Sequence, residues 1–179
     1  FVGNDACASC HETQVQDWTN SHHDLAMQEV NEKTVLGDFN NATFTYEGFT
    51  TTFFRKGDEY WVKTDNENGE LQDYRVAYVF GVYPLQQLLL PIQNDRLNAL
   101  SIAWDARNVS EGGQRWYHIY EDQEPVTSES PLHWTGVYHN WNSRCAECHS
   151  TNVVKGYDGK RRHYATTYDQ IDVGCEACH

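Results

Sequence analysis

The sequence contains no run of about 18 apolar residues, the length that a membrane-spanning helix needs, and so predicts no membrane span. It is also poor in basic residues, with 13 Lys and Arg against 26 Asp and Glu and a formal net charge of −13. Such a charge repels phosphate, which argues against nucleic acid as a partner. Apolar residues make up only 39% of the chain, below the ~45–50% usual for a globular domain. A core made of side chains alone would therefore be thin.

Cysteine is absent from the whole middle of the chain, between Cys10 and Cys145. All six cysteines lie near the two ends, in three Cys-x-x-Cys-His units: Cys7–His11, Cys145–His149 and Cys175–His179. No cysteine is left over, and no longer segment repeats at the period of a solenoid. The residues that carry chemistry are therefore concentrated at the two ends.

The spacing within each unit has a chemical reason. Two thiols one helical turn apart can add to the two vinyl groups of a haem, and the adjacent histidine then faces the iron as proximal ligand. A single unit could also be a thioredoxin-like redox pair or half of a zinc site. Three units that each end in histidine favour haem. We predict three covalently attached haem c groups, bound by Cys7, Cys10, Cys145, Cys148, Cys175 and Cys178, with iron ligands His11, His149 and His179.

Haem attachment of this kind predicts export, to the periplasm or the cell exterior. The chain begins at Phe1 without a basic and then apolar leader, as expected of a mature exported protein. Three porphyrins would also supply the apolar surface that the composition lacks.

The pattern along the chain predicts an α+β fold, in which short helices and loops around three covalent haems enclose an antiparallel β insert. We expect an N-terminal haem 1 segment over 1–34, a β-rich insert over 35–128 and a C-terminal segment with haems 2 and 3 over 129–179. The three segments should form one compact unit.

Individual elements follow from periodicity and turn residues. A helix is predicted over 12–27, where Gly and Pro are absent and apolar residues share one side. Lys56-Gly57-Asp58 predicts the turn of a β-hairpin, and Gly112-Gly113 predicts another turn. The stretch between Pro84 and Pro91 reads as a short helix or a loop, and short helices and loops follow Pro131. The predicted strands are Thr50–Arg55, Glu59–Thr64, Tyr74–Phe80, Ala99–Trp104 and Arg115–Tyr120.

The second axial position of each iron decides between electron transfer and catalysis, because a filled position blocks substrate. His22 and His23 would lie ~17–18 Å along the predicted helix from His11, too far to share its iron, so they would reach a different haem. His118 shares one face of a predicted strand with two aromatic residues, and His133 precedes the second motif.

A purely structural role is the alternative at His118. A buried, hydrogen-bonded core histidine explains His118 about equally well. His139 and His163 are flanked by polar residues and are expected at the surface. Met27 is the one thioether that could serve as a ligand.

The chain resembles bacterial multihaem cytochromes with Cys-x-x-Cys-His motifs, a family in which tetratricopeptide repeats often follow. The resemblance covers most of the chain and rests on the three motifs and on flanking segments, among them Trp18-x-x-Ser21-x-His23, Tyr78–Val82, Gly113–His118 and His133–Gly136. It implies that His23, more than His22, is a distal ligand to a neighbouring haem, and it favours His118 and His133. It also implies that relatives continue beyond the position of His179.

Three functions stay open at this point. The first is an electron-transfer protein with filled axial positions and redox proteins as partners. Because motifs occupy both chain ends, copies of it could also join head to tail in a filament. The second is a haem oxidoreductase that reduces a small oxyanion at a five-coordinate iron. The third makes the β insert a binding module and the haems its redox reporter.

Overall fold

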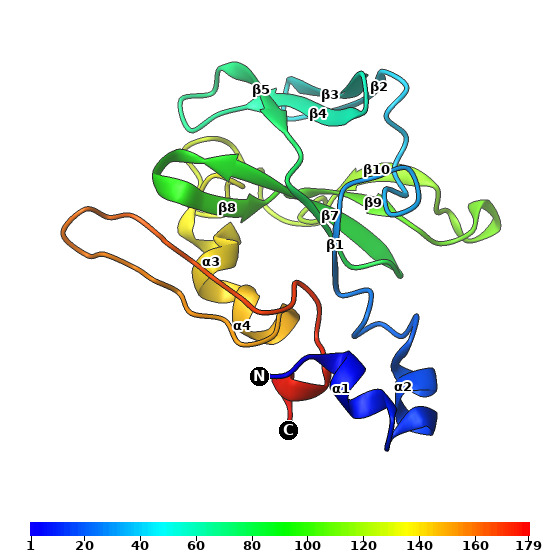
Figure 1. The fold of residues 1–179 in the computed structure, drawn as a ribbon. Coiled ribbons are helices and arrows are strands. Elements are labelled where there is room, and N and C mark those ends of the chain that lie inside the picture. The colour runs from blue at the N-terminus through cyan, green and yellow to red at the C-terminus, as the bar shows by residue number, and fades with distance from the viewer.

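The computed structural model describes all residues from Phe1 to His179. Two antiparallel sheets lie one above the other, and short helices lie below them, so the fold is α+β as expected (Figure 1). The chain termini lie side by side at the bottom of the molecule (Figure 1). The two end segments are therefore brought together by the fold between them.

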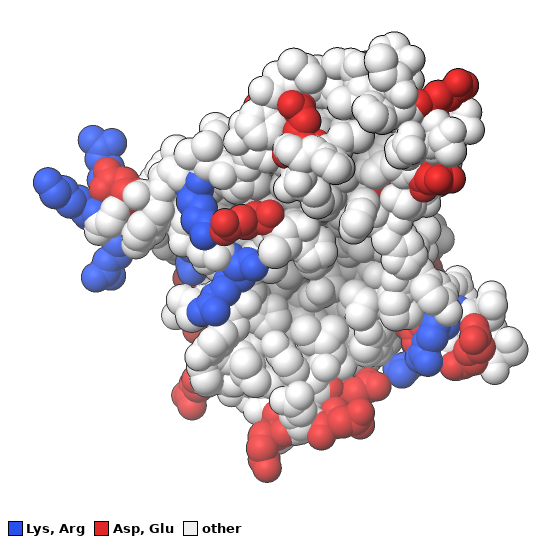
Figure 2. All heavy atoms as spheres, turned by 90° about the horizontal axis from the view of Figure 1, so that it is seen from below, with Lys and Arg blue, Asp and Glu red and all other residues white.

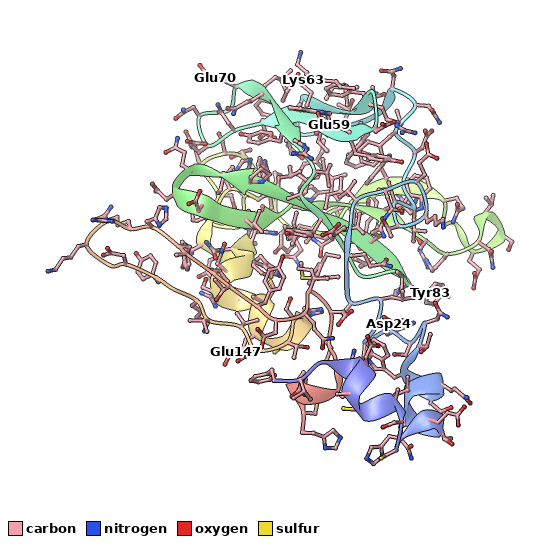
Figure 3. All side chains as sticks on the ribbon, viewed as in Figure 1. Asp24, Glu59, Lys63, Glu70, Tyr83 and Glu147 are labelled. Atoms are coloured by element: carbon pink, nitrogen blue, oxygen red, sulfur yellow. The ribbon has the colours of Figure 1, made fainter.

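The upper sheet is a four-stranded meander. The predicted hairpin is confirmed, because Lys56 pairs with Glu59 across a two-residue turn in which Gly57 has φ +60°. Figure 3 places Glu59, Lys63 and Glu70 on the outer part of this sheet. Its strands are β2 (Ala42–Tyr46), β3 (Phe49–Lys56), β4 (Glu59–Asp65) and β5 (Leu71–Arg75).

The second sheet has six strands in the order β1-β6-β7-β9-β10, with β8 paired to β7. It draws β1 from the N-terminal segment, which ties the first motif to the β insert. The strands are β1 (Met27–Glu29), β6 (Tyr78–Phe80), β7 (Leu85–Ile92), β8 (Arg96–Ala99), β9 (Ile102–Asp105) and β10 (Arg115–His118).

The main core lies between the sheets and is rich in aromatic rings. Phe53 of the upper sheet stacks on Trp116 of the lower one, with ring centroids 3.6 Å apart and planes 1° apart. Phe39 packs edge-on against both rings. Gly37 lies under the Trp116 indole, and a Cβ at this position would collide with that ring. Large rings thus fill a core that the composition predicted to be thin.

The stretch between Pro84 and Pro91 is a strand, not a helix or a loop. Leu88 and Leu90 point into the main core, whereas Leu89 points into a second core on the other side of β7. A strand that is covered on both faces shows a continuous apolar run rather than alternation. The sequence signal was therefore ambiguous here.

The predicted helix over 12–27 is wrong in its second half. Helix α2 runs only from Glu12 to Trp18, and Asn20 then takes a left-handed conformation with φ +62°. The Asp24 carboxylate accepts a hydrogen bond from the Asn20 amide at 2.7 Å. Short polar side chains of this kind compete for backbone groups and favour turns over helix.

Two further predicted strands are each divided. Tyr74–Phe80 is split between β5 and β6, and Ala99–Trp104 is split between β8 and β9. The turn at Gly112-Gly113 is confirmed, with Gly112 at φ +82°. The predicted strand over Arg115–Tyr120 is present but ends at His118.

The helical elements are short, and three of them, α1, α4 and η4, contain residues of the motifs. They are α1 (Asn4–Ala8), α2 (Glu12–Trp18), α3 (Trp141–Arg144), α4 (Ala146–His149) and the short 3-10 helices η1 (Gln93–Asp95), η2 (Val109–Glu111), η3 (Val137–His139) and η4 (Cys175–Ala177). Residues 152–168 form a projecting arm, drawn in orange in Figure 1. None of the helices has the length and apolar character to cross a bilayer.

Candidate haem-attachment sites

All three motifs adopt the same backbone turn. In each, the amides of the second cysteine and of the histidine donate to the carbonyl of the first cysteine, at 3.0–3.3 Å. This single helical turn brings both cysteines and the histidine to one side. The first cysteine of each motif is half-buried and the second is exposed. The repeated geometry is what attachment of a flat group through two thiols requires.

The first and third motifs contact each other within one chain. The Asn4 side-chain oxygen accepts a hydrogen bond from the Cys175 amide at 2.8 Å. The Glu176 carboxylate accepts from the Val2 and Gly3 amides at 2.8–3.0 Å. These bonds join α1 to η4 although their residues are more than 170 positions apart.

A cavity of about 420 Å³ lies between these two motifs. The cysteines Cys7 and Cys175 and the histidines His11 and His179 all line it, and Val15 adds apolar surface. Burial is the main cause that raises the pKa of the Cys175 thiol, and the nearby Cys7 thiol adds to it. Cysteine and histidine side chains of two motifs thus face one largely apolar space, which fits attachment of apolar macrocycles.

The third motif is held from two further directions. The Trp18 indole N–H donates to the Val173 carbonyl at 2.8 Å, and the Thr151 hydroxyl accepts from the Gly174 amide at 2.8 Å. A Cβ at Gly174 would collide with the Gln170 side chain. Close packing at this glycine therefore fixes where the third motif begins.

The second motif packs directly against the six-stranded sheet. The His149 ring lies 4.4 Å from the Phe80 ring, centroid to centroid, and its Nδ1 is buried without a hydrogen-bond partner. Burial lowers the pKa of His149 and raises that of Cys145. Glu147 faces outward at the edge of α4 (Figure 3) and pairs with Lys155 of the arm at 3.0 Å.

Met27 is not placed as a haem ligand. Its thioether sulfur accepts a hydrogen bond from the Trp141 indole N–H at 2.9 Å, and both residues are 1% exposed. The Ser150 hydroxyl also approaches the sulfur, at 3.6 Å. This sulfur instead anchors α3 and the second motif to β1.

His22 and His23 lie in the turns after α2, and both are exposed. The His23 carbonyl accepts a hydrogen bond from the Val173 amide at 3.2 Å, so His23 neighbours the third motif. The spacing along a continuous helix that we used for these histidines does not apply, because the helix ends at Trp18. Neither imidazole has a hydrogen-bond partner in the chain, which leaves both available as ligands.

His133 is held in the interior by both of its ring nitrogens. Nδ1 lies 2.8 Å from the Thr135 hydroxyl, and Nε2 lies 2.9 Å from the Asp65 carboxylate. Ligation of an iron would require one of these buried bonds to be given up. His133 therefore lies in the core with both ring nitrogens engaged by the chain, and its role as a distal ligand stays a prediction.

His118 is also a core residue, only 3% exposed. Its ring stacks on Tyr46 at 3.8 Å, and its Nδ1 accepts from the Tyr120 amide at 3.3 Å. The cavity that His118 and His133 line measures about 20 Å³, space for roughly one water and none for a porphyrin. His118 is thus a buried, hydrogen-bonded histidine, and ligation of an iron by it stays a prediction.

The surface prediction for His139 is wrong. The residue is 5% exposed, and its Nε2 lies 3.1 Å from the Leu132 carbonyl. The surface prediction rested on its polar neighbours in the sequence, which do not show that the imidazole itself is buried. His163 does lie at the surface, where it pairs with Asp95 at 2.7 Å.

No three His, Cys, Asp or Glu side chains converge as the ligands of a metal ion would, and the six cysteines are not paired in disulfides. A haem iron takes a single proximal histidine from its attachment motif and needs no such cluster.

The chain matches the family model described as cytochrome c554 and c-prime, over residues 6–47 and 109–179. These residues make up more than half of the chain and include all three motifs. The chain belongs to this family. No curated protein and no solved structure matches the chain.

Membership makes the chain a c-type cytochrome of electron transfer, with covalent haem c as its cofactor. The unmatched residues 48–108 contain β3 to β9, the greater part of the two sheets. Sequence reasoning found the motifs of this cytochrome but missed Asn4 and Glu176, which join its ends. No local signal marks these residues, because their partners lie at the opposite end of the chain.

Proposed function

We propose that the cytochrome carries three covalently bound haem c groups and passes electrons between them and redox partner proteins. Cys7 and Cys10 would hold the first haem, and the corresponding pairs of the other two motifs would hold the second and third. His11, His149 and His179 would be the proximal ligands. The turn that recurs at all three motifs carries this proposal. The haem iron supplies the one-electron carrier.

The protein's own part is to hold and space these groups. The bonds of Asn4 and Glu176 fix the first and third motifs beside one cavity. The bond between Trp141 and Met27 fixes the second motif on the sheet. Rigid spacing favours transfer between neighbouring haems, because a carrier works best when its surroundings do not rearrange. The sheets support this spacing and contain no cysteine of their own.

We further propose His23 as the distal ligand of one haem, with His22 as the second candidate. Both imidazoles are exposed and unpartnered, and His23 adjoins the third motif. His23→Ala should therefore convert one low-spin haem to high spin in electron paramagnetic resonance spectra. His163→Ala, which removes an imidazole paired with Asp95, is the matched control and should leave the spectrum unchanged.

An enzyme that reduces a small oxyanion is the alternative. It requires an open iron position, which cyanide or nitrite would occupy. Spectra of the oxidised protein that contain only low-spin signals, unchanged by either ligand, support electron transfer. A high-spin signal of the wild-type protein that shifts when cyanide or nitrite is added would replace our proposal with the enzyme.

We keep a head-to-tail filament as a proposal, although the contact between the first and third motifs favours it less than their positions in the sequence did. The first and third motifs contact each other in one chain, so they are not left free to meet those of neighbouring copies. A filament would have to form through their outer surfaces. Light scattering that detects only monomers at micromolar concentration would eliminate it. Export to the periplasm or cell exterior is likewise our proposal, and it rests on the haem chemistry.

A further inference from the structure

The outer end of the projecting arm lines a pocket whose basic residues have no acidic partner. The pocket measures about 360 Å³ and lies between the arm, the β7–β8 turn and the start of α3. Its lining includes Arg96 and Arg162 but no Asp or Glu. In a chain with 26 acidic and 13 basic residues, two unpaired arginines in one pocket call for an explanation. The arginines that do pair with carboxylates are Arg55, Arg75, Arg107, Arg115 and Arg161.

The arm is fixed in place over this pocket. His163 pairs with Asp95 at 2.7 Å, and the Tyr164 amide donates to the Asn94 carbonyl at 3.1 Å. The pair with His163 also occupies the Asp95 carboxylate, the acid closest in sequence to Arg96. The pocket is therefore formed in advance, and little ordering would be lost when a ligand binds.

Three residues around the pocket have left-handed backbone conformations. Arg162 has φ +53°, Asn94 has φ +65° and Asp95 has φ +53°. A left-handed conformation is unfavourable for a long side chain such as arginine, and residues held in this way concentrate at functional sites. At Arg162 the conformation sets the direction in which the side chain leaves the arm. The left-handed conformation thus occurs at one of the two arginines that line the pocket.

The walls of the pocket are not purely polar. Tyr157 and Tyr164 line it with rings 4.7 Å apart, and Val137 adds an apolar surface. Tyr157 is 53% exposed and Val137 is 61% exposed. Figure 2 shows basic side chains gathered on the arm, whereas acidic side chains dominate the opposite parts of this face. The arm is the place on this acidic molecule where a negatively charged ligand meets least repulsion.

We propose that this pocket binds a small organic dianion, such as a phosphate monoester. The charged group would lie between the Arg96 and Arg162 guanidinium groups, which bind phosphate or carboxylate through paired hydrogen bonds. The organic part would contact the rings of Tyr157 and Tyr164. Nothing in this proposal depends on the number of haems or on their ligands.

Calorimetric titration of the haem-loaded protein at low salt tests the proposal, with phenyl phosphate and inorganic phosphate as probes. Wild-type protein should bind one equivalent of phenyl phosphate at the pocket, about tenfold more tightly than inorganic phosphate because of the ring contacts. Arg96→Gln and Arg162→Asn should each weaken phenyl phosphate binding roughly 10- to 100-fold. Asparagine is chosen at 162 because it tolerates the left-handed conformation.

Arg161→Asn is the matched control, because Arg161 is the neighbour of Arg162 on the arm but pairs with Asp158. It should leave the affinity within about twofold of wild type. Equal losses in the 161 and 162 variants would mean that the overall charge of the arm binds the anion, which overturns the pocket. The proposal is also overturned if phenyl phosphate does not bind or if the two probes bind with equal affinity. It is overturned as well if binding survives in both pocket variants, as binding at an open haem iron would.

Discussion

Acidification from pH 7.5 to pH 5 should destabilise the fold through His118. Burial of this ring beside Tyr46 is the main cause that lowers its pKa, from 6.5 to about 4. Because the pKa is lower in the folded chain, the unfolded chain binds more protons between these two values. The contribution of neutral His118 to the unfolding free energy is therefore fully present above pH 6.5 and is lost as the pH drops towards 4.

The size of the effect follows from the shift. Each unit of pKa shift corresponds to about 1.36 kcal/mol. The unfolding free energy therefore falls by about 3 kcal/mol in total below pH 4, and by about 2 kcal/mol at pH 5. Burial also lowers the pKa of His139, which acts in the same direction. The neighbouring His139 and, to a smaller extent, His133 also lower the pKa of His118, and the Asp65 carboxylate opposes this shift.

The assay is urea unfolding of the haem-loaded protein, followed by far-UV circular dichroism at both pH values. His118→Asn removes the titration, and its amide oxygen can accept the Tyr120 N–H bond that Nδ1 accepts now. The loss of unfolding free energy between pH 7.5 and 5 should be about 2 kcal/mol smaller in this variant. His163→Asn provides the reference for a half-exposed imidazole. A loss in His118→Asn equal to that of wild type would refute the reasoning.

Two further substitutions test how the motifs are held. Trp141→Phe removes the N–H donor to the Met27 sulfur and should lower the unfolding free energy by about 1–2 kcal/mol, as measured by urea titration. An unchanged midpoint would mean that this hydrogen bond does not stabilise the fold. Gly174→Ala forces a Cβ against the side-chain ends of Gln170 and Asn4, so the Asn4 oxygen that accepts from the Cys175 amide must also shift, and the change should cost about 1 kcal/mol. Gly159→Ala, where a Cβ would meet only the Tyr157 ring at 3.9 Å, should cost under ~0.5 kcal/mol, and equal costs for both glycines would contradict the packing.

The local turn of each motif could be predicted from the sequence, because it involves only five consecutive residues with a fixed spacing of cysteines and histidine. It was also sufficient for the hairpin at Gly57, whose turn residues and flanking strands agree. Both features depend on neighbours in the chain. Hydrogen bonds between neighbours and turn chemistry decide them before tertiary packing acts.

Features that depend on distant partners could not be predicted. The run through Leu89 reads as helix or loop until both of its faces are known to be covered by the two cores. His139 has polar neighbours yet is buried against the Leu132 carbonyl. The bond from Cys175 to Asn4, which unites the chain ends, has no trace in either local sequence. In each case tertiary contacts override the local pattern.

The most direct test of the account is the intact mass of the purified, haem-loaded protein and of three variants, each with both cysteines of one motif changed to serine. The account predicts a wild-type mass that exceeds the polypeptide by three haems, retained under denaturing conditions because thioether bonds are covalent. Each variant should lose the mass of one haem. A wild-type mass without added haem, or a variant that keeps all three, would contradict the assignment of one haem to each motif.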